Sequence, residues 1–217
     1  MSRNKNSQEI EELKYKLIVI GDELVGKTAI LNRFKNNQFN AIYEPTVGLE
    51  FQSIPILIDE QSVNLLLYDM SGHQKFRGLI PLYTSDANII LLIYDTTNSE
   101  SFSNIEKWYE SLSNINKEDA IFFLVGNKID LVEQRKVKEE DGKLYADSHN
   151  YIFQEVSALT GDGIQELFLN KLLSQIRTQF LYKGKFVGDQ EEEKLKFNLQ
   201  TNKEKIKKNK KCCCCVN

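Results

Sequence analysis

Cysteine is absent from the first 211 residues of this 217-residue chain, and all four cysteines stand together at 212–215. Disulfide frameworks spread their cysteines along the chain, and zinc sites space them so that the side chains converge. Four adjacent thiols do neither, so they indicate another chemistry at that end. A core without thiols fits a reducing compartment.

The chain also lacks long hydrophobic runs and a recognisable targeting segment. No apolar stretch reaches the ~18 residues typical of a membrane span. The polar start, MSRNKNSQEIEELK, has the pattern of neither a secretory signal nor a transit peptide. The length and the 41% hydrophobic content fit one globular domain with extensions, so we expect a cytosolic body.

Negative charge exceeds positive charge in the body, and positive charge is concentrated in the tail. From Leu181 onward there are ten Lys and five acidic residues, so this segment carries +5; the whole chain carries −3, which leaves −8 on the first 180 residues. An acidic body argues against nucleic-acid binding, and a basic end favours an anionic membrane surface. We expect an N-terminal extension at 1–13, a domain at 14–180 and a flexible polar tail at 181–217.

Apolar runs alternate with amphipathic stretches through the expected domain. The patterns predict strands at 14–20, 51–58, 63–68, 88–94, 120–125 and 151–156, and helices at 26–36, 101–112, 138–148 and 164–180. Such alternation is typical of an α/β sandwich with a mostly parallel sheet. Ligands of these sheets bind at the carboxyl ends of the strands.

A phosphate-binding pattern follows the first predicted strand and opens the first predicted helix. Residues 21–28, GDELVGKT, match G-x-x-x-x-G-K-[ST]. The glycines let backbone N–H groups point at anionic oxygens, and the helix N-terminus adds a positive dipole end. Lys27 then reaches the β- and γ-phosphates, and the Thr28 hydroxyl binds Mg²⁺. The motif predicts a nucleoside triphosphate but does not select the base.

Asn127, Lys128 and Asp130 follow the fifth predicted strand and point to guanine. The carboxylate of Asp130 accepts hydrogen bonds from N1–H and the 2-amino group of guanine, whereas adenine offers neither donor there. The segment Ser157, Ala158 and Leu159 follows the last strand, where a backbone N–H would reach guanine O6.

Two further loops have the residues of a nucleotide-dependent switch. Thr46 would bind Mg²⁺ only while a γ-phosphate holds its loop, and the N–H of Gly72 would bond the same phosphate. Asp69 would stand behind the metal. Loss of the γ-phosphate would release both loops.

With these motifs the chain resembles a Ras-superfamily small GTPase, specifically a Rab, over residues 15–180. The segments that carry the Rab resemblance are VGLEF at 47–51, KFRGL at 75–79, LIYDTT at 92–97 and NIEKW at 104–108. The resemblance implies a six-stranded, mostly parallel sheet with one antiparallel edge strand, five helices, and cycling between GDP- and GTP-bound states.

The resemblance also implies roles for individual residues. Phe39 would pack on the guanine ring, and Lys27, Gly72 and the residue at 73 would take part in hydrolysis. The nucleotide-binding set that it implies comprises Glu23, Leu24, Val25, Gly26, Lys27, Thr28, Ala29, Phe39, Tyr43, Thr46, Gly72, Asn127, Lys128, Asp130, Ser157, Ala158 and Leu159, with Thr28, Thr46 and Asp69 serving Mg²⁺.

The sequence departs from the family pattern at several positions. His73 stands where a water-orienting glutamine is usual, so we expect slow intrinsic hydrolysis, and the alternative is a tolerated substitution with near-normal cycling. Glu23 and Leu24 replace small residues beside the phosphates. Tyr68 replaces a tryptophan and Leu159 a lysine, which are milder changes.

The extreme C-terminus combines a lysine cluster with the terminal thiols. Two prenyl groups give stable membrane attachment, whereas one binds marginally. The resemblance makes Cys214 and Cys215 the expected geranylgeranylation sites, while a loose C-a-a-X pattern leaves single prenylation at Cys214 open. Cys212 and Cys213 are either spare or palmitoylated.

The sequence therefore predicts a monomeric GTPase on the cytoplasmic face of an intracellular membrane, with a cytosolic pool. The resemblance implies an exchange factor, an activating protein, a GDP-dissociation inhibitor, a prenylation escort and effectors that contact the switch loops. Two alternatives are a nearly inactive, GTP-loaded membrane scaffold and a metabolic kinase. The kinase would need an acceptor site and a lid, for which no segment is evident.

Overall fold

The computed structural model of the chain describes residues 13–182, except residues 43, 60, 113 and 118. The chain divides into two compact units, Met1–Gln179 and Phe180–Asn217, and the described part of the second is the end of helix α6 (Leu173–Tyr182). The boundaries expected at 13 and 180 stay predictions. No helix in the described ranges is long and apolar enough to cross a bilayer.

Six strands form one sheet in the order β2-β3-β1-β4-β5-β6. The edge strand β2 runs antiparallel to β3, and the other neighbouring pairs are parallel. The strands are β1 (Leu13–Ile20), β2 (Leu49–Ile58), β3 (Gln61–Met70), β4 (Ile89–Asp95), β5 (Ile121–Asn127) and β6 (Ile152–Glu155). The predicted sheet, with its one antiparallel edge strand, is confirmed.

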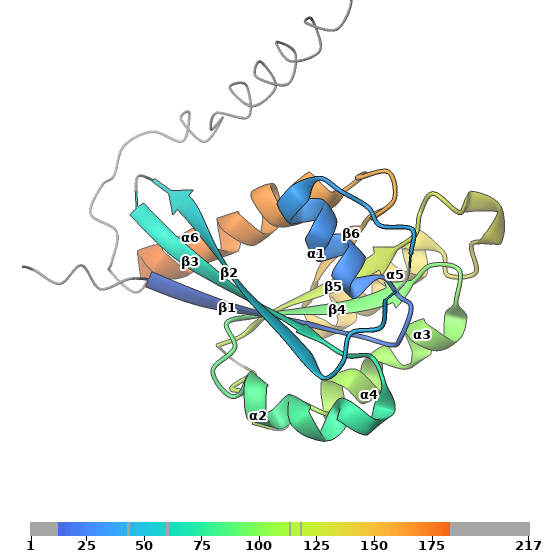
Figure 1. Ribbon diagram of the computed structural model, residues 1–217, viewed down its shortest axis with the longest axis horizontal. Helices are drawn as coiled ribbons and strands as arrows, with labels where there is room; N and C mark the ends of the chain where they lie inside the picture. Colours follow the sequence, from blue (N-terminus) through green and yellow to red (C-terminus); the bar gives the residue numbers. More distant parts are fainter. Residues whose placement is uncertain (1–12, 43, 60, 113, 118, 183–217) are drawn as a thin grey trace, which may run out of the picture. The chain divides into compact units, whose positions relative to one another are not determined.

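Helices cover both faces of the sheet, with α1 and α6 on one side and α2 and α4 on the other (Figure 1). The helical segments are α1 (Lys27–Asn36), η1 (Gln74–Leu79), α2 (Ile80–Thr84), α3 (Ser99–Ser103), α4 (Ile105–Glu110), η2 (Val132–Gln134), α5 (Glu139–His149), the π-helical η3 (Glu166–Leu172) and α6. Since α3 with α4 and η3 with α6 are directly consecutive, they make the five helices that the resemblance implies. The apolar pattern gave no signal for α2, which is five residues long and has proline in its first turn.

The helix predicted at 101–112 is interrupted. Asn104 ends α3 and begins α4, with φ −77° and ψ −7°. The helix also starts earlier than predicted, because the side chain of Asn98 accepts a hydrogen bond from the N–H of Glu100 and caps it. The side chain of Asn104 points elsewhere, to the phosphate-binding turn, as described below.

The core is built on the central strands, and every residue of β4 is buried. On one face Ile18 and Ile20 pack in a cluster that includes Trp108 of α4. On the other, Phe34 of α1 stacks on Phe168 of η3 with ring centroids 4.0 Å apart. Because β3, β1, β4, β5 and β6 are parallel neighbours, their carboxyl ends lie at the same edge of the sheet. Polar side chains gather at that edge.

Candidate functional site

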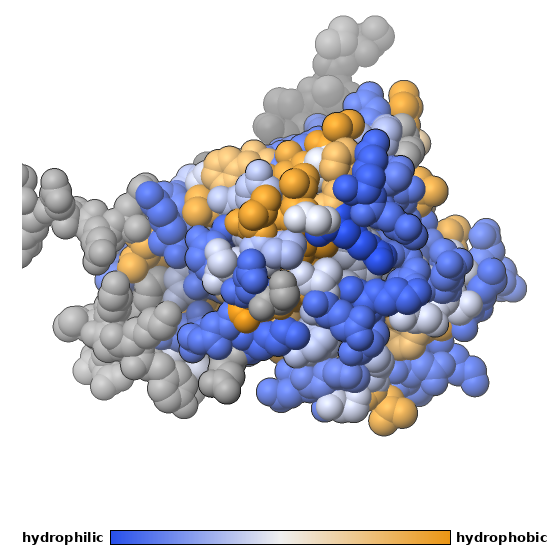
Figure 2. Space-filling view, turned by 90° about the horizontal axis from the view of Figure 1, so that it is seen from below, coloured by the Kyte–Doolittle hydropathy of each residue, from blue (hydrophilic) through white to orange (hydrophobic). Residues whose placement is uncertain are grey.

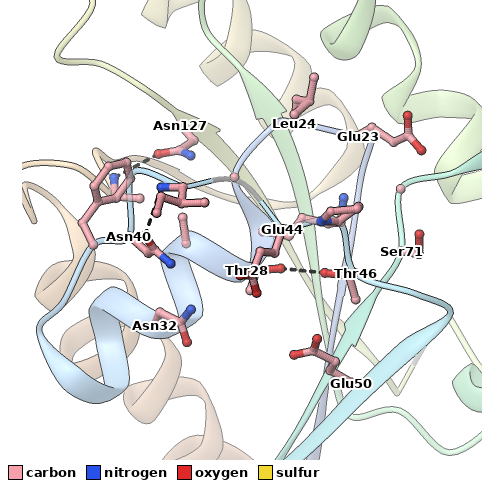
Figure 3. A pocket seen from close by; sticks show the side chains of 18 of the residues that line it. Glu23, Leu24, Thr28, Asn32, Asn40, Glu44, Thr46, Glu50, Ser71 and Asn127 are labelled. Atoms are coloured by element: carbon pink, nitrogen blue, oxygen red, sulfur yellow. Dashed lines mark hydrogen bonds between the residues drawn. The ribbon is translucent and has the colours of Figure 1, made fainter.

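An open cleft of about 830 Å³ lies at this carboxyl edge, lined by the turn after β1, by α1 and by loops after β3, β5 and β6 (Figure 3). The predicted site residues that line it are Glu23, Leu24, Gly26, Lys27, Thr28, Ala29, Phe39, Thr46, Gly72, His73, Asn127, Lys128, Asp130, Ala158 and Leu159. The structure thus brings together segments far apart in the chain, as the motifs require.

Three other predicted residues are buried, and each is hydrogen-bonded to a residue of the lining. They are Val25, Asp69 and Ser157. Tyr43, Cys214 and Cys215 lie outside the described residues. The lining also contains residues that the motifs did not identify, among them Asn40, Glu44, Glu50 and Phe76.

The turn after β1 is shaped to receive an anion. Gly26 has φ +94°, and a Cβ there would lie 2.2 Å from Nδ2 of Asn127, so only glycine fits this close approach. Lys27 is 6% exposed, and its ammonium group donates to the carbonyls of Gly21 at 3.0 Å and Asp22 at 2.6 Å.

Burial lowers the pKa of Lys27 to about 8, while the carboxylates of Asp69, Asp22 and Glu23 act in the opposite direction. A buried cation that is not fully compensated favours an anionic ligand, because the ligand charge offsets the lost hydration. The residues present therefore fit a phosphate group.

Three oxygen-bearing side chains converge next to Lys27. The Thr28 hydroxyl lies 3.0 Å from the hydroxyl of Thr46 and donates to Oδ2 of Asp69. The other carboxylate oxygen of Asp69 is buried without a hydrogen-bond partner, and burial raises the pKa of Asp69 to about 6.

These oxygens fit Mg²⁺, which takes few protein ligands and completes its shell with water and phosphate oxygens. Within the described ranges no group of three His, Cys, Asp or Glu side chains is placed to hold a metal by itself. A cation here would depend on the phosphates of the bound nucleotide.

The opposite end of the cleft holds the predicted base-reading residues in a hydrogen-bonded frame. Asn127 donates to the carbonyl of Val25 at 2.8 Å and accepts from the N–H of Ala158 at 3.1 Å. Ser157 donates to Oδ1 of Asp130 at 2.5 Å. The phosphate turn and the two base loops are therefore linked through one amide side chain.

Lys128 has a partner that the motifs did not reveal. Its ammonium group lies 2.7 Å from Oδ2 of Asp95, the last residue of β4, while Oδ1 of Asp95 accepts from the backbone and hydroxyl of Thr97. Asp95 and Asn127 are register partners on β4 and β5. Asp95 thus fixes the base loop from the neighbouring strand.

The segment after β3 packs directly on the phosphate turn. A Cβ on Gly72 would lie 2.4 Å from the backbone nitrogen of Glu23, so the two backbones touch. His73 extends from this contact, and its Nδ1 accepts a hydrogen bond of 3.3 Å from the N–H of Lys75 at the start of η1. One of the two ring nitrogens is thereby engaged within its own segment.

Together, the α/β sheet, the phosphate turn and the base loops define a P-loop nucleotide-binding protein. The model of the Ras family matches residues 16–178, well over half of the chain, so this protein belongs to the Ras family and is a small GTPase. Members of this family bind guanine nucleotides with Mg²⁺, hydrolyse GTP and interact with exchange factors, activating proteins and effectors.

The geometry assigns distinct tasks to the two ends of the cleft. Lys27 and the N–H groups of the turn would hold the phosphates, and Thr28, Thr46 and Asp69 would hold Mg²⁺, which when bound neutralises charge on the β- and γ-phosphates. Asp130, positioned by Ser157, would bind the base edge. Because Gly72 touches the turn at Glu23, the segment after β3 would be in a position to respond to the presence of a γ-phosphate.

Proposed function

We propose that this small GTPase is a Rab-like switch of intracellular membrane traffic with slow intrinsic hydrolysis and a prenylated C-terminus. The observation that carries the proposal is the combination of one guanine-nucleotide cleft with the terminal pair Cys214 and Cys215 beside a lysine cluster. In such a protein the bound nucleotide sets the conformation of the loops that partners contact, and the lipid anchor holds the protein at a membrane. Partners are therefore recruited to that membrane according to the nucleotide state.

An aromatic surface next to the switch segments supports an effector-binding role. The rings of Phe51 and Tyr68 lie 5.0 Å apart, and Tyr68 and Tyr83 lie 6.4 Å apart, so one row joins β2, β3 and α2. Phe51 is 53% exposed and Leu82, on α2, is 70% exposed. Viewed from below Figure 1, where α2 lies, the surface has apolar residues gathered among polar ones (Figure 2). Exposed apolar area of this kind favours a protein partner.

Slow hydrolysis is supported by the residue at 73. A glutamine amide presents a donor and an acceptor to water at once, whereas an imidazole whose Nδ1 already accepts from the N–H of Lys75 retains only Nε2 for water. Glu23 also lines the cleft and brings a negative charge close enough to act on Lys27. The second candidate is a GTP-loaded scaffold that scarcely turns over, which these same two residues favour.

Nucleotide content and turnover separate the two candidates. Protein purified without added nucleotide is expected to carry mostly GDP if the switch cycles, and mostly GTP if it is a scaffold. If calorimetry with folded, nucleotide-free protein detects no binding of GDP or GTP, both candidates fail.

The membrane role has its own test within the cysteine run. A tagged protein with Cys214→Ser and Cys215→Ser is expected to become fully cytosolic, whereas Cys212→Ser with Cys213→Ser is expected to leave membrane attachment in place. Mass spectrometry of the native protein counts the lipids, and a single prenyl group on Cys214 would replace the double anchor with the alternative. If both double variants stay on the membrane, attachment does not depend on Cys214 and Cys215.

A further inference from the structure

Arg33 connects helix α1 to the loop that follows β6. Its Nε donates to the carbonyl of Ala158 at 2.8 Å, and its Nη2 donates to the carbonyl of Leu159. The remaining branch, Nη1, donates to the carbonyl of Asn37 at 2.9 Å, just past the end of α1. One guanidinium group therefore bridges two loops that meet at the base end of the cleft.

The loop held by Arg33 is held from its other side by the base-reading residues. The N–H of Ala158 points to Oδ1 of Asn127 and the hydroxyl of Ser157 to Asp130. Bonds within the turn, such as the N–H of Gly161 to the carbonyl of Ser157 at 2.8 Å, fix its local shape. They do not fix its distance from a bound base, because both partners belong to the turn.

We propose that Arg33 is a positioning residue for guanine recognition: it holds the loop at 157–159 so that its backbone N–H groups face O6 of the base. The inference rests on the proposed binding role of that loop. When guanine O6 competes with Asn127 for an N–H of the loop, the contacts from Arg33 remain and keep the loop in place.

Arg33 suits this task because of its geometry and its location. A guanidinium group offers donors in a fixed planar fork, so it fixes several carbonyls at once where an ammonium group would satisfy fewer. Among the described residues that line the cleft, Asn32 is present and Arg33 is not. Arg33 thus acts through the loop and does not itself bind the nucleotide.

A simpler role is also open to Arg33, because its bond to Asn37 would stabilise the end of α1 and, with it, the following segment that carries Phe39. A stacking side chain such as Phe39 contacts any purine. Loss of that role would weaken all purine nucleotides alike, whereas loss of loop positioning weakens only those with an oxygen at position 6.

Three diphosphates separate these roles when Arg33→Ala is compared with the wild type. GDP has O6, N1–H and the 2-amino group, inosine diphosphate keeps O6 and N1–H but lacks the amino group, and 2-aminopurine riboside diphosphate keeps the amino group but lacks O6 and the N1 proton. Dissociation constants are measured by competition against a fluorescent GDP derivative in Mg²⁺. We expect Arg33→Ala to weaken GDP and inosine diphosphate by about tenfold, and 2-aminopurine riboside diphosphate by less than about threefold.

Two further variants serve as controls, one for a conservative replacement of Arg33 and one for the loss of a positive charge from α1. Arg33→Lys is expected to lose less GDP affinity than Arg33→Ala, because a lysine still reaches one carbonyl. Lys35→Ala removes a cation from the same helix that contacts Gln52 and is expected to leave all three affinities unchanged. Circular dichroism and thermal melting establish that each variant is folded, and Arg33→Lys replaces Arg33→Ala in the comparison if the latter is not.

Each outcome has a separate meaning. Equal losses on all three diphosphates, or no loss on any, overturn the positioning role of Arg33. If the wild type binds GDP and inosine diphosphate equally well, Asp130 does not read the 2-amino group. The proposed function fails separately, if the wild type binds neither GDP nor GTP. The positioning role also falls if the wild type binds GDP and 2-aminopurine riboside diphosphate equally well.

Discussion

Asp22, in the turn after β1, accepts a hydrogen bond of 2.7 Å from the indole N–H of Trp108 on α4. Its other carboxylate oxygen accepts from Nδ2 of Asn104 at 2.8 Å. The guanidinium group of Arg77 in η1 lies 3.8 Å from Asp22 and 4.3 Å from the centroid of the Trp108 ring. The start of the phosphate turn is therefore fastened to α4 and to the segment after β3.

Removal of this carboxylate should destabilise the domain. Asp22→Ala leaves the N–H of the fully buried Trp108 without an acceptor, and we expect a loss of about 2–3 kcal/mol in the free energy of unfolding. Asp22→Asn keeps one acceptor and should lose less. Urea denaturation measures both, with Asp147→Ala, an exposed carboxylate on α5, as the control. If Asp22→Ala loses no more stability than the control, these hydrogen bonds make no net contribution to the free energy of unfolding.

A methyl group at residue 72 should separate the segment after β3 from the phosphate turn. The Cβ of Gly72→Ala would meet the backbone of Asp22 and Glu23 at 2.4 Å, and backbone atoms do not yield as a side chain does. We expect GTP affinity to fall about tenfold or more relative to GDP affinity, since only GTP needs the closed segment. Nucleotide competition assays measure the ratio.

Gly78→Ala is the matched control, because a Cβ at Gly78 meets nothing within 4 Å. It should leave the ratio of GTP to GDP affinity unchanged. An equal shift in both variants would attribute the effect to the flexibility of the segment, and an unchanged ratio in Gly72→Ala would show that the contact with Glu23 does not sense the γ-phosphate.

The chemistry of the cleft was largely predictable from sequence, because the phosphate and base motifs consist of contiguous residues at the ends of strongly apolar strands. The residues that support them were not. Asp22, Arg33 and Asp95 act on partners 33 to 126 positions away. Single Asp and Arg residues are common on helices and turns that face solvent. Their presence in the sequence therefore does not indicate a contact with a distant residue.

Two features of the fold escaped prediction for related reasons. Helix α2 is shorter than two turns, so no apolar period develops in it. The break at Asn104 follows from the geometry of a tertiary contact, since its side chain reaches Asp22 across 82 positions. The helix propensities of the residues around Asn104 do not indicate the position of this break.

Acid should stabilise the protein when nucleotide and Mg²⁺ are removed. Burial raises the pKa of Asp69 from its ordinary value of 3.8 to about 6, so the folded state binds the proton more tightly than the unfolded state. Stability contributed by this group is fully present below about pH 4 and is lost as pH rises through about 6, by up to about 3 kcal/mol. Chemical denaturation of nucleotide-free protein between pH 7 and pH 5 measures part of this change, roughly 1.3 kcal/mol.

The matched comparison is Asp69→Asn, which removes the titrating group but keeps its size. The gain on acidification should be smaller in this variant, and in the wild type it should disappear when GDP and Mg²⁺ are present, because the cation favours the charged carboxylate. A gain of the same size in wild type and Asp69→Asn would assign it to another group.

The final prediction concerns the rate of hydrolysis. His73→Gln restores a side chain with a donor and an acceptor at the position next to Gly72, free of the bond that His73 makes to the N–H of Lys75. We expect single-turnover GTP hydrolysis to accelerate by about tenfold, equivalent to about 1.4 kcal/mol in the barrier, with little change in GTP affinity. The protein has one other histidine, His149 on α5, and His149→Gln should leave the rate unchanged. If His73→Gln is no faster than the wild type, the imidazole is a tolerated substitution, and slow intrinsic hydrolysis is not a property of this switch.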